Sequence, residues 1–224
     1  MTGTPSSHLR GRRTRAAGTP APALALALAL AAVGAVAASA PAASARSQDR
    51  APTCRGVGVD PKAEIRYRSD IVIKAPISRI FKTQTDVARW PAWQSPVLTA
   101  ERLDHGPLRA GSAFRWTTPA PATPTTPATT LVITSTVRQL ERDRCVRWRG
   151  PAVGEGLRID EGVHVWTFTK VRDGVLVRTE ETWTGAQVEA DVPTATQALG
   201  AGLEAWLRDL KTAAEAPHRG HAAR

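Results

Sequence analysis

The stretch HVWTFTKVRDGVLVRTEETWT, residues 164–184, shows the clearest structural pattern in this chain of 224 residues. Large and small side chains alternate on both sides of Asp173-Gly174, as they do in half-buried strands. An Asp-Gly pair between two such runs is typical of a two-residue type I′ hairpin turn. We therefore predict two antiparallel strands in which Arg172 faces Val175.

The hairpin determines which side chains share a face of the sheet. Arg178, Glu180 and Thr182 form the solvent-facing set, and the opposite face is rich in aromatic rings. His164 and Glu181 then lie on adjoining strands of the aromatic face, one cross-strand step apart. The predicted register pairs Phe168 with Thr179, Trp166 with Glu181, and His164 with Trp183.

The same alternation extends outward to the rest of the chain. Residues 64–74 alternate as a half-buried strand, after which Pro76 starts a short helix from Ile77 to about Thr85. Asp86 can cap a second short helix that runs to Trp90. Six further strands are predicted at Val97–Leu103, Ser112–Thr118, Leu131–Leu140, Cys145–Arg149, Ile159–Thr169 and Val175–Thr184.

The last segment, from about residue 192 to 216, changes to a helical period. Pro193, Thr194 and Gln197 stand at its start and resemble a capping signature. A long closing helix with one apolar stripe is therefore predicted. The stripe consists of Leu199, Leu203, Trp206 and Leu210.

Two glycines, Gly200 and Gly202, lie inside this predicted helix. Each costs about 1 kcal/mol relative to alanine in a helix interior, so some other interaction must offset that cost. Close approach of the helix to the sheet is one explanation, and clearance for a ligand beneath the helix is the other.

Residues 118–130 interrupt the strand pattern, because nearly all of them are Pro, Thr or Ala. Proline cannot donate a ladder hydrogen bond, so we predict an extended, exposed hairpin loop that does not pair as a strand. In an exported protein such an insert is a site for O-glycosylation, and an unmodified disordered insert is the alternative.

The first 45 residues have the three parts of a bacterial export signal. Four arginines precede an apolar run from about residue 20 to 38, and two Ala-Ser-Ala sequences follow. Cleavage near Ala45 is predicted, which makes the protein secreted or cell-surface. An uncleaved membrane anchor is the alternative, and Arg12-Arg13 leaves a twin-arginine route open beside the general one.

Removal of the signal leaves a flexible segment at 46–62, one domain at 63–216 and a disordered tail at 217–224. The whole chain carries a net charge of +10, and without the four signal arginines 26 basic residues face 20 acidic ones, a net charge of +6. The basic residues are interleaved with acidic ones, which fits solvated strand faces and argues against nucleic-acid binding. No membrane span is predicted after cleavage.

Two cysteines, Cys54 and Cys145, remain in the mature chain. Disulfides persist in the compartments that exported proteins reach, so the two could form one bond that closes a loop of about 90 residues. Two unpaired thiols are the alternative. Neither cysteine belongs to a metal-binding spacing, and no metal site is predicted.

No standard catalytic or cofactor motif is present, so no cofactor is predicted. His164 and Glu181 are the most suggestive pair, because a carboxylate within reach raises the proton affinity of an imidazole. Such a pair can act as an acid/base group in an apolar pocket, with Arg115 or Tyr67 stabilising charge. The alternative is a structural pair whose polar groups satisfy each other.

The order of elements, one strand, two short helices, six strands and a long helix, resembles the SRPBCC superfamily. This superfamily has the helix-grip fold of START domains, Bet v 1-like proteins and polyketide cyclase/dehydrase-like proteins. The resemblance spans residues 64–216 and is strongest to the polyketide cyclase-like branch. The segments that carry it are 75–81, 86–93, 106–111 with 114–116, 164–168 and 180–185.

The resemblance implies an α+β fold in which a curved seven-stranded antiparallel sheet wraps around the long C-terminal helix, with two short helices after the first strand. It also implies a cavity between the sheet and that helix for an apolar or amphipathic small molecule or lipid. The predicted lining residues are Tyr67, Trp90, Trp93, Phe114, Trp116, Ser135, Trp148, His164, Trp166, Phe168, Thr179, Glu181, Trp183, Leu199, Leu203 and Trp206.

Three functions compete on this basis. The first is an exported protein that binds a lipid, aromatic or polyketide-like ligand. The second is a cyclase or dehydratase-like enzyme, although an export signal separates the chain from substrates tethered to intracellular carrier proteins. The third is a solid-core protein that interacts through its outer surface. The oligomeric state stays open.

Overall fold

A computed structural model describes residues 51–124 and 126–217. The predicted export signal at 1–45 and nearly all of the predicted tail lie outside these residues. Within them, no helix is long and apolar enough to cross a membrane.

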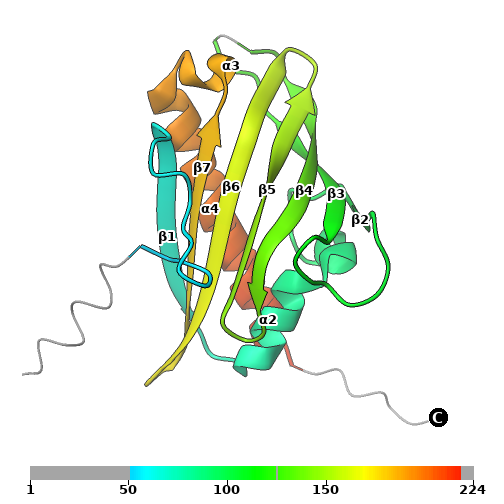
Figure 1. Cartoon of the computed structure of the whole chain (residues 1–224), viewed down its shortest axis with the longest axis vertical. Helices are drawn as coiled ribbons and strands as arrows, with labels where there is room; N and C mark the ends of the chain where they lie inside the picture. The colour runs from blue at the N-terminus through cyan, green and yellow to red at the C-terminus, as the bar shows by residue number, and fades with distance from the viewer. Residues whose placement is uncertain (1–50, 125, 218–224) are drawn as a thin grey trace, which may run out of the picture. The chain divides into compact units, whose positions relative to one another are not determined.

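The described chain forms one seven-stranded antiparallel sheet with strand order β1-β7-β6-β5-β4-β3-β2 (Figure 1). This arrangement confirms the predicted helix-grip fold. The strands are β1 (Ile65–Ile73), β2 (Thr99–Arg102), β3 (Ala113–Ala120), β4 (Thr129–Glu141), β5 (Cys145–Gly154), β6 (Leu157–Val171) and β7 (Gly174–Thr184). The helices are α2 (Ile77–Thr85), the 3-10 helix η1 (Val87–Ala92), α3 (Ala186–Glu189) and α4 (Val192–Glu215).

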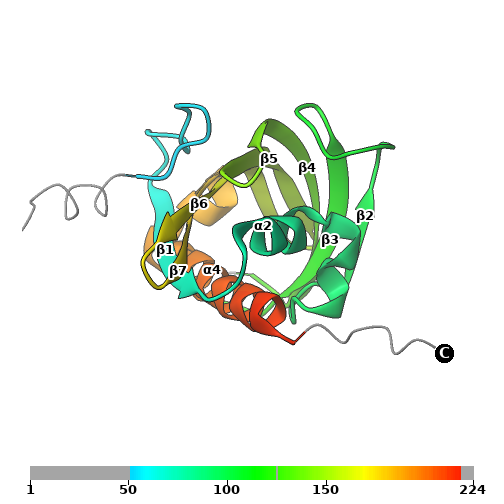
Figure 2. The ribbon, with the colours of Figure 1, turned by 90° about the horizontal axis from the view of Figure 1, so that it is seen from below.

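The sheet curves around α4 and α2, as the view from below shows (Figure 2). Two groups of buried side chains fill the space that it encloses. The group around α2 and the C-terminal half of α4 is aromatic and includes Trp90, Phe114 and Trp166, none of which is exposed. The group around the N-terminal half of α4 is mainly aliphatic and includes Leu199 and Leu203.

The β6–β7 hairpin has a different register from the predicted one. His164 pairs with Glu181, so every partner is shifted by two residues. The turn consists of Arg172 and Asp173, and neither has a positive φ, so the type I′ prediction is wrong. A side chain at Gly174 would place its Cβ 2.5 Å from the Ile73 carbonyl oxygen. Gly174 lies so close to β1 that only a glycine fits there.

The insert at 118–130 forms strand at both ends, which contradicts the prediction that it cannot pair. Pro119 pairs with Thr130 and Ala120 with Thr129. Strand β2 reaches only as far as Thr117, whose carbonyl accepts from Leu98. In a strand, the backbone groups of successive residues point alternately to the two neighbouring strands. Thr117 and Pro119 therefore point to the same side, where β2 pairs with Thr117 but does not reach Pro119. The N–H that Pro119 lacks would have no strand partner there.

Strands β5 and β6 are also longer than predicted and meet at a turn of Glu155 and Gly156. A register shift between Gly150 and Ala152 lets β5 continue past Pro151. Gly150 is required there, because a Cβ would lie 1.8 Å from the Thr134 carbonyl oxygen.

The start of α4 is capped by Asp191 rather than by the predicted Pro-Thr-Gln signature. Its carboxylate accepts a hydrogen bond from the Thr194 backbone N–H at 3.1 Å, and Pro193 lies in the first turn. The preceding short helix α3 was not predicted. Asp86 makes no side-chain cap at η1, which also differs from the prediction.

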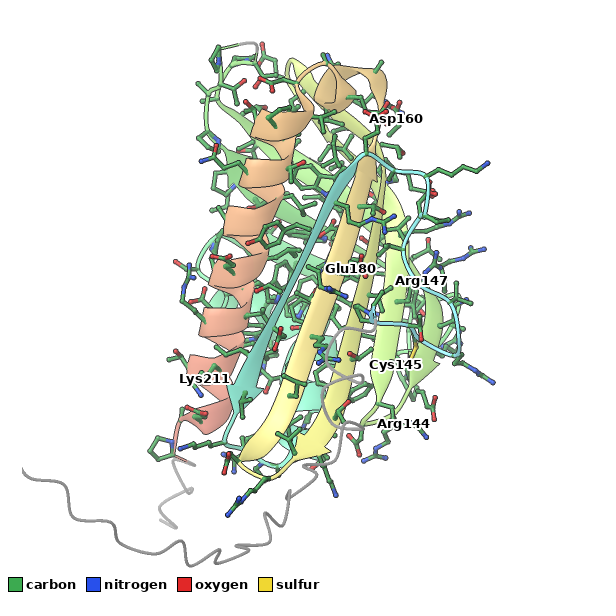
Figure 3. All side chains as sticks on the ribbon, turned by 90° about the vertical axis from the view of Figure 1, so that its left-hand side faces the viewer. Arg144, Cys145, Arg147, Asp160, Glu180 and Lys211 are labelled. Carbon is green, nitrogen blue, oxygen red and sulfur yellow. A yellow bond between two sulfur atoms is a disulfide. The ribbon has the colours of Figure 1, made fainter. Side chains whose placement is uncertain are left out.

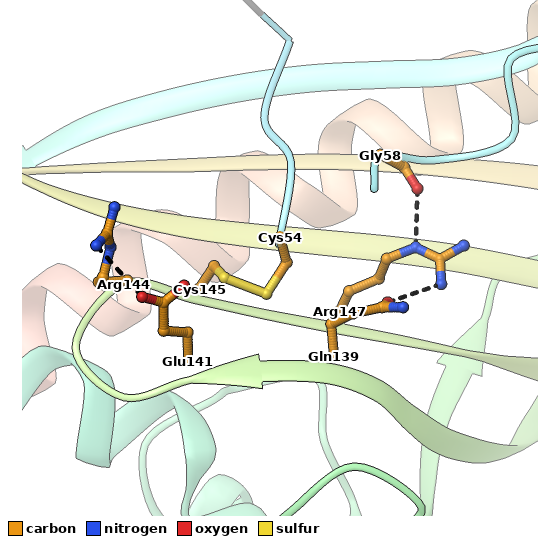
Figure 4. The surroundings of a disulfide bond; sticks show 7 residues. All are labelled: Cys54, Gly58, Gln139, Glu141, Arg144, Cys145 and Arg147. Carbon is orange, nitrogen blue, oxygen red and sulfur yellow. Dashed lines mark hydrogen bonds and ion pairs between the residues drawn. A yellow bond between two sulfur atoms is a disulfide. The ribbon is translucent and has the colours of Figure 1, made fainter. Parts of the chain in front are cut away.

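The segment before β1 lies on the outer face of the sheet. A disulfide joins Cys54 to Cys145 at the start of β5 (Figure 4). Arg147 donates from Nε to the Gly58 carbonyl at 2.8 Å and from Nη1 to Gln139 Oε1 at 3.1 Å. Figure 3 shows Arg147 on this side of the molecule, together with the buried Glu180 of β7.

Candidate functional site

A cavity of about 270 Å³ lies between the inner face of the sheet and the N-terminal half of α4. This volume is close to the lower limit of about 300 Å³ for small-molecule pockets. Most of the wall is apolar. The aliphatic part consists of Leu131 and Ile133 of β4, Ala152 of β5, Leu157 and Ile159 of β6, Val188 of α3, and Ala195, Ala198, Leu199 and Leu203 of α4.

The predicted lining residues divide into two groups. Eight of them line the cavity: Trp116, Ser135, Trp148, Glu181, Trp183, Leu199, Leu203 and Trp206. The other eight do not: Tyr67, Trp90, Trp93, Phe114, His164, Trp166, Phe168 and Thr179.

Part of the second group forms a solid aromatic core beside the cavity. The Trp90 ring lies edge-to-face against Phe114 at 5.4 Å and against Trp206 at 5.0 Å. Phe168 packs against Phe81 at 5.4 Å. Such ring pairs stabilise by about 0.5–1.5 kcal/mol beyond their buried area. These rings therefore form a packed core next to the cavity.

His164 and Glu181 form a buried pair at the edge of the cavity. His164 Nδ1 lies 3.0 Å from Glu181 Oε2, and His164 Nε2 lies 2.6 Å from Thr179 Oγ1. Trp183 donates from Nε1 to Glu181 Oε1 at 2.9 Å. The Glu181 side chain is 18% exposed and that of His164 is 4% exposed, so only the carboxyl group is accessible from the cavity.

Burial controls the proton affinities of this pair. It lowers the pKa of His164 to about 3, because the charged imidazolium loses its hydration. It raises the pKa of Glu181 to about 7, and the hydrogen bond from Trp183 offsets this only in part. Between about pH 3 and pH 7 the pair therefore carries no net charge, and above pH 7 Glu181 is ionised beside a neutral His164. This differs from the predicted rise in the proton affinity of the imidazole.

The two predicted charge-stabilising residues lie away from the pair. Arg115 belongs to the outer face of β3, is exposed, and has its Nη1 3.5 Å from Glu101 Oε1. The Tyr67 hydroxyl donates to Glu204 Oε1 of α4 at 2.5 Å. Among the described residues, no three His, Cys, Asp or Glu side chains gather as metal ligands would.

Two polar atoms of cavity-lining residues have no hydrogen-bond partner. Gln94, which follows η1 and is 1% exposed, has an unpartnered Oε1. Trp116 on β3 has an unpartnered Nε1. Buried polar atoms of this kind cost free energy unless something satisfies them, so they mark a place where a ligand can bind.

The two glycines of α4 have different surroundings. A Cβ at Gly200 would lie 2.6 Å from the Tyr67 ring, so this glycine lets the helix approach β1. A Cβ at Gly202 would meet nothing within 4 Å, and Gly202 lines the cavity. Close approach therefore explains Gly200. Gly202 is exposed at the border of the cavity, and no contact there requires a glycine.

Sequence reasoning missed several lining residues. Ala195, Ala198 and Gly202 follow one another at helical spacing, so this stripe of small residues was a signal that could have been found. The rest of the missed wall comes from β3, β5 and β6, from α3, from the start of α4 and from loops. It includes Gln94, Pro96, Val97, Thr118, Pro119, Ala120, Pro121, Thr123, Thr126, Gly150, Gly162, Gln187, Asp191 and Thr194.

Comparison with known proteins adds a family and several structural relatives. A family model described as polyketide cyclase / dehydrase and lipid transport matches residues 64–215. No curated protein matches the sequence.

Among solved structures, the chain is similar to the di-domain ARO/CYC StfQ of the steffimycin biosynthetic pathway, with 16% identity and a TM-score of 0.53. The alignment covers 67% of this chain and 50% of StfQ, so the chain spans half the length of that relative. A hypothetical protein from Helicobacter pylori gives 16% identity and a TM-score of 0.54 over 69% of this chain and 90% of its own.

The Zhui aromatase/cyclase from a Streptomyces species gives 13% identity and a TM-score of 0.51 over 71% of this chain and 98% of its own. At such identities these likenesses show the fold alone. They agree with the seven-stranded sheet and the long closing helix described above.

Proposed function

The chain belongs to the polyketide cyclase/dehydrase and lipid transport family, and we propose that it is an exported protein that binds a hydrophobic or amphipathic small molecule. The cavity between the sheet and α4 is the proposed binding site. The observation that carries this proposal is the apolar cavity itself, with its wall of aliphatic and indole side chains.

Binding fits the site better than catalysis does. The proposed enzyme needs His164, Glu181 and a charge-stabilising group around one point of the cavity. His164 does not line the cavity, and Arg115 lies on the outer face of the sheet. Any proton transfer from the His164–Glu181 pair to a ligand would have to run through Glu181. A solid-core protein is also disfavoured, because the cavity is present.

Export is supported by the sequence of residues 1–45 and by the bond between Cys54 and Cys145. Disulfides persist in oxidising compartments and are rare in the bacterial cytosol. Expression of the full chain in a secreting bacterial host, followed by N-terminal sequencing of the protein outside the cytoplasm, tests this part. A start near Arg46 is expected, and retention of the intact N-terminus in the cytoplasm would contradict export.

The binding function is tested by blocking the cavity. Native mass spectrometry of the secreted protein is expected to show an apolar ligand that co-purifies or exchanges with a panel of lipids and aromatic metabolites. Gly202→Phe places a ring in the open space beside the cavity, and we expect it to abolish ligand retention without unfolding the protein.

Ala201→Phe is the matched control. Ala201 is the neighbouring helical residue, is exposed, and does not line the cavity. It adds the same ring to α4 and should leave ligand retention unchanged. If neither the parent protein nor Ala201→Phe retains or exchanges any apolar molecule, the proposed function is wrong.

A further inference from the structure

Four of the seven tryptophans line the cavity together with the carboxyl group of Glu181. Trp183 donates to that carboxyl, and the rings of Trp116 and Trp206 lie edge-to-face at 5.3 Å. Trp148 also lines the cavity and is 5% exposed. The indoles thus belong to the same wall as the carboxyl group.

The rings and the carboxyl group form one connected group in the cavity wall. His164 joins them, because its ring lies 5.1 Å from Trp148 and 6.3 Å from Trp206 while its Nδ1 contacts Glu181. Leu131 and Leu157 belong instead to the aliphatic part of the wall. Trp116 and Trp183 also pack against the aliphatic cluster, so the aromatic group with Glu181 directly adjoins the aliphatic wall.

The charge of the wall is opposite to the charge of the protein. The chain has 30 basic and 20 acidic residues. Among the described residues that line the cavity, however, the ionisable ones are the acids Glu181 and Asp191, and there is no lysine, arginine or histidine. A ligand with a carboxylate or phosphate group would meet no cation there.

The N-terminus of α4 does not change this conclusion. A helix N-terminus attracts anions, and the first turn of α4 lies beside the cavity. The carboxylate of Asp191 already accepts the Thr194 N–H. A hydrogen bond with the Thr194 side chain, and then this backbone one, lower the pKa of Asp191. The protein therefore supplies its own anion at that end of the helix.

Gln94 gives an independent indication of a polar ligand group. Its Oε1 is a buried hydrogen-bond acceptor without a partner, and the residue lines the same cavity. An acceptor oxygen is satisfied by a donor or by the polarised C–H groups of an ammonium. The other unpartnered polar atom of the wall, Trp116 Nε1, is a donor. Gln94 Oε1 adds an acceptor to the Glu181 carboxyl group and therefore favours a ligand group that is positively charged or donates hydrogen bonds.

From this arrangement we propose that the cavity selects an amphiphile with an ammonium headgroup, held against the four indoles and Glu181, with its apolar tail along the aliphatic wall. The negative faces of indole rings attract cations, and cages of aromatic rings recognise quaternary ammonium groups. This inference rests on the proposed binding function and adds the charge of the ligand to it.

Three probes with one tail and different headgroups test the inference: octyltrimethylammonium, octan-1-ol and octanoate. Calorimetric titrations of the purified protein, expressed from the full chain, are performed at pH 8.5, above the Glu181 pKa of about 7. We expect octyltrimethylammonium to bind at least about tenfold more tightly than octan-1-ol, and octanoate to bind most weakly. Equal or tighter binding of octanol or octanoate would overturn the ammonium preference and leave the binding function intact.

Two variants locate the preference in the cavity. Glu181→Gln keeps the shape of the side chain and should lower the affinity for octyltrimethylammonium, relative to that for octan-1-ol, about five- to tenfold. Trp116→Leu should likewise reduce the cation preference. If both variants keep the parent ratio of the two affinities, the headgroup does not lie at this wall. If no probe binds the folded parent protein, the ammonium inference fails together with the binding function.

Discussion

At the scale of single residues, folding removes the side chains of Glu181 and His164 from water and places them in contact. The Glu181 pKa rises from 4.5 to about 7, so its contribution to stability is present below pH 4.5 and lost as the pH rises through 7. The His164 pKa falls from 6.5 to about 3, so its contribution is present above pH 6.5 and lost as the pH falls through 3.

Glu181→Gln is expected to remove the loss of stability that the parent protein shows as the pH rises through 7. The amide stays uncharged and can still donate to His164 Nδ1 and accept from Trp183. The melting temperature of the variant minus that of the parent should therefore grow from about pH 5 to about pH 8. Thermal unfolding followed by circular dichroism measures it. Glu155→Gln, at an exposed turn, is the control. If the difference in melting temperature from the parent does not change with pH for either variant, the prediction is wrong.

The neighbouring positions of His164 and Glu181 could be predicted because a register error of two residues leaves every side chain on its face. The same alternation places Arg115 opposite to Phe114 and Trp116, so its outward position was also available from the sequence. The pKa values could not be predicted, since they depend on how deeply the surrounding rings bury the pair.

At the scale of the elements, α4 offers a comparison of one substitution at two positions. Gly202→Ala should stabilise the protein by about 0.5–1 kcal/mol, because alanine favours the helix and its Cβ meets open space. Gly200→Ala should destabilise it by about 1–2 kcal/mol, because overpacking against the hydrogen-bonded Tyr67 ring exceeds the helical gain. Urea unfolding measures both, and effects of the same sign would contradict the contacts described for α4.

The helix itself and its apolar stripe could be predicted from the sequence, because the apolar residues of this segment recur with a period of about 3.6 residues. Which glycine approaches the sheet could not be predicted, since this depends on where α4 crosses β1. The strand ends inside the insert could not be predicted either. A proline in a strand is tolerated only where the neighbouring strand has ended, and the length of β2 decides that at Pro119.

At the scale of the whole molecule, one covalent bond connects residues 91 positions apart. A loop of this length lowers the entropy of the unfolded chain enough to stabilise the fold by up to about 4–5 kcal/mol. Reduction of Cys54–Cys145 should therefore lower the free energy of unfolding by about 2–5 kcal/mol, measured in urea with and without a reducing agent. A Cys54→Ala/Cys145→Ala variant should not respond to the reducing agent, and an insensitive parent protein would contradict the prediction.

The division of the interior into a solid core and a cavity was beyond sequence analysis. The inward faces of the strands carry large rings in both regions, so alternation treats Trp166 of the core and Trp116 of the cavity wall alike. The difference arises from α2 and η1, which fill one end of the space between the sheet and α4 and do not reach the other end.

The packing of the indoles also gives the protein an optical property. Trp206 lies within 5.0–6.0 Å of Trp90, Trp116 and Trp166, and it lines the cavity as well. Rings this close exchange electronic excitation, so light absorbed anywhere in the cluster can be emitted or quenched beside the cavity. A molecule that enters the cavity will therefore change the ultraviolet fluorescence of the whole cluster, and occupancy can be followed without a dye.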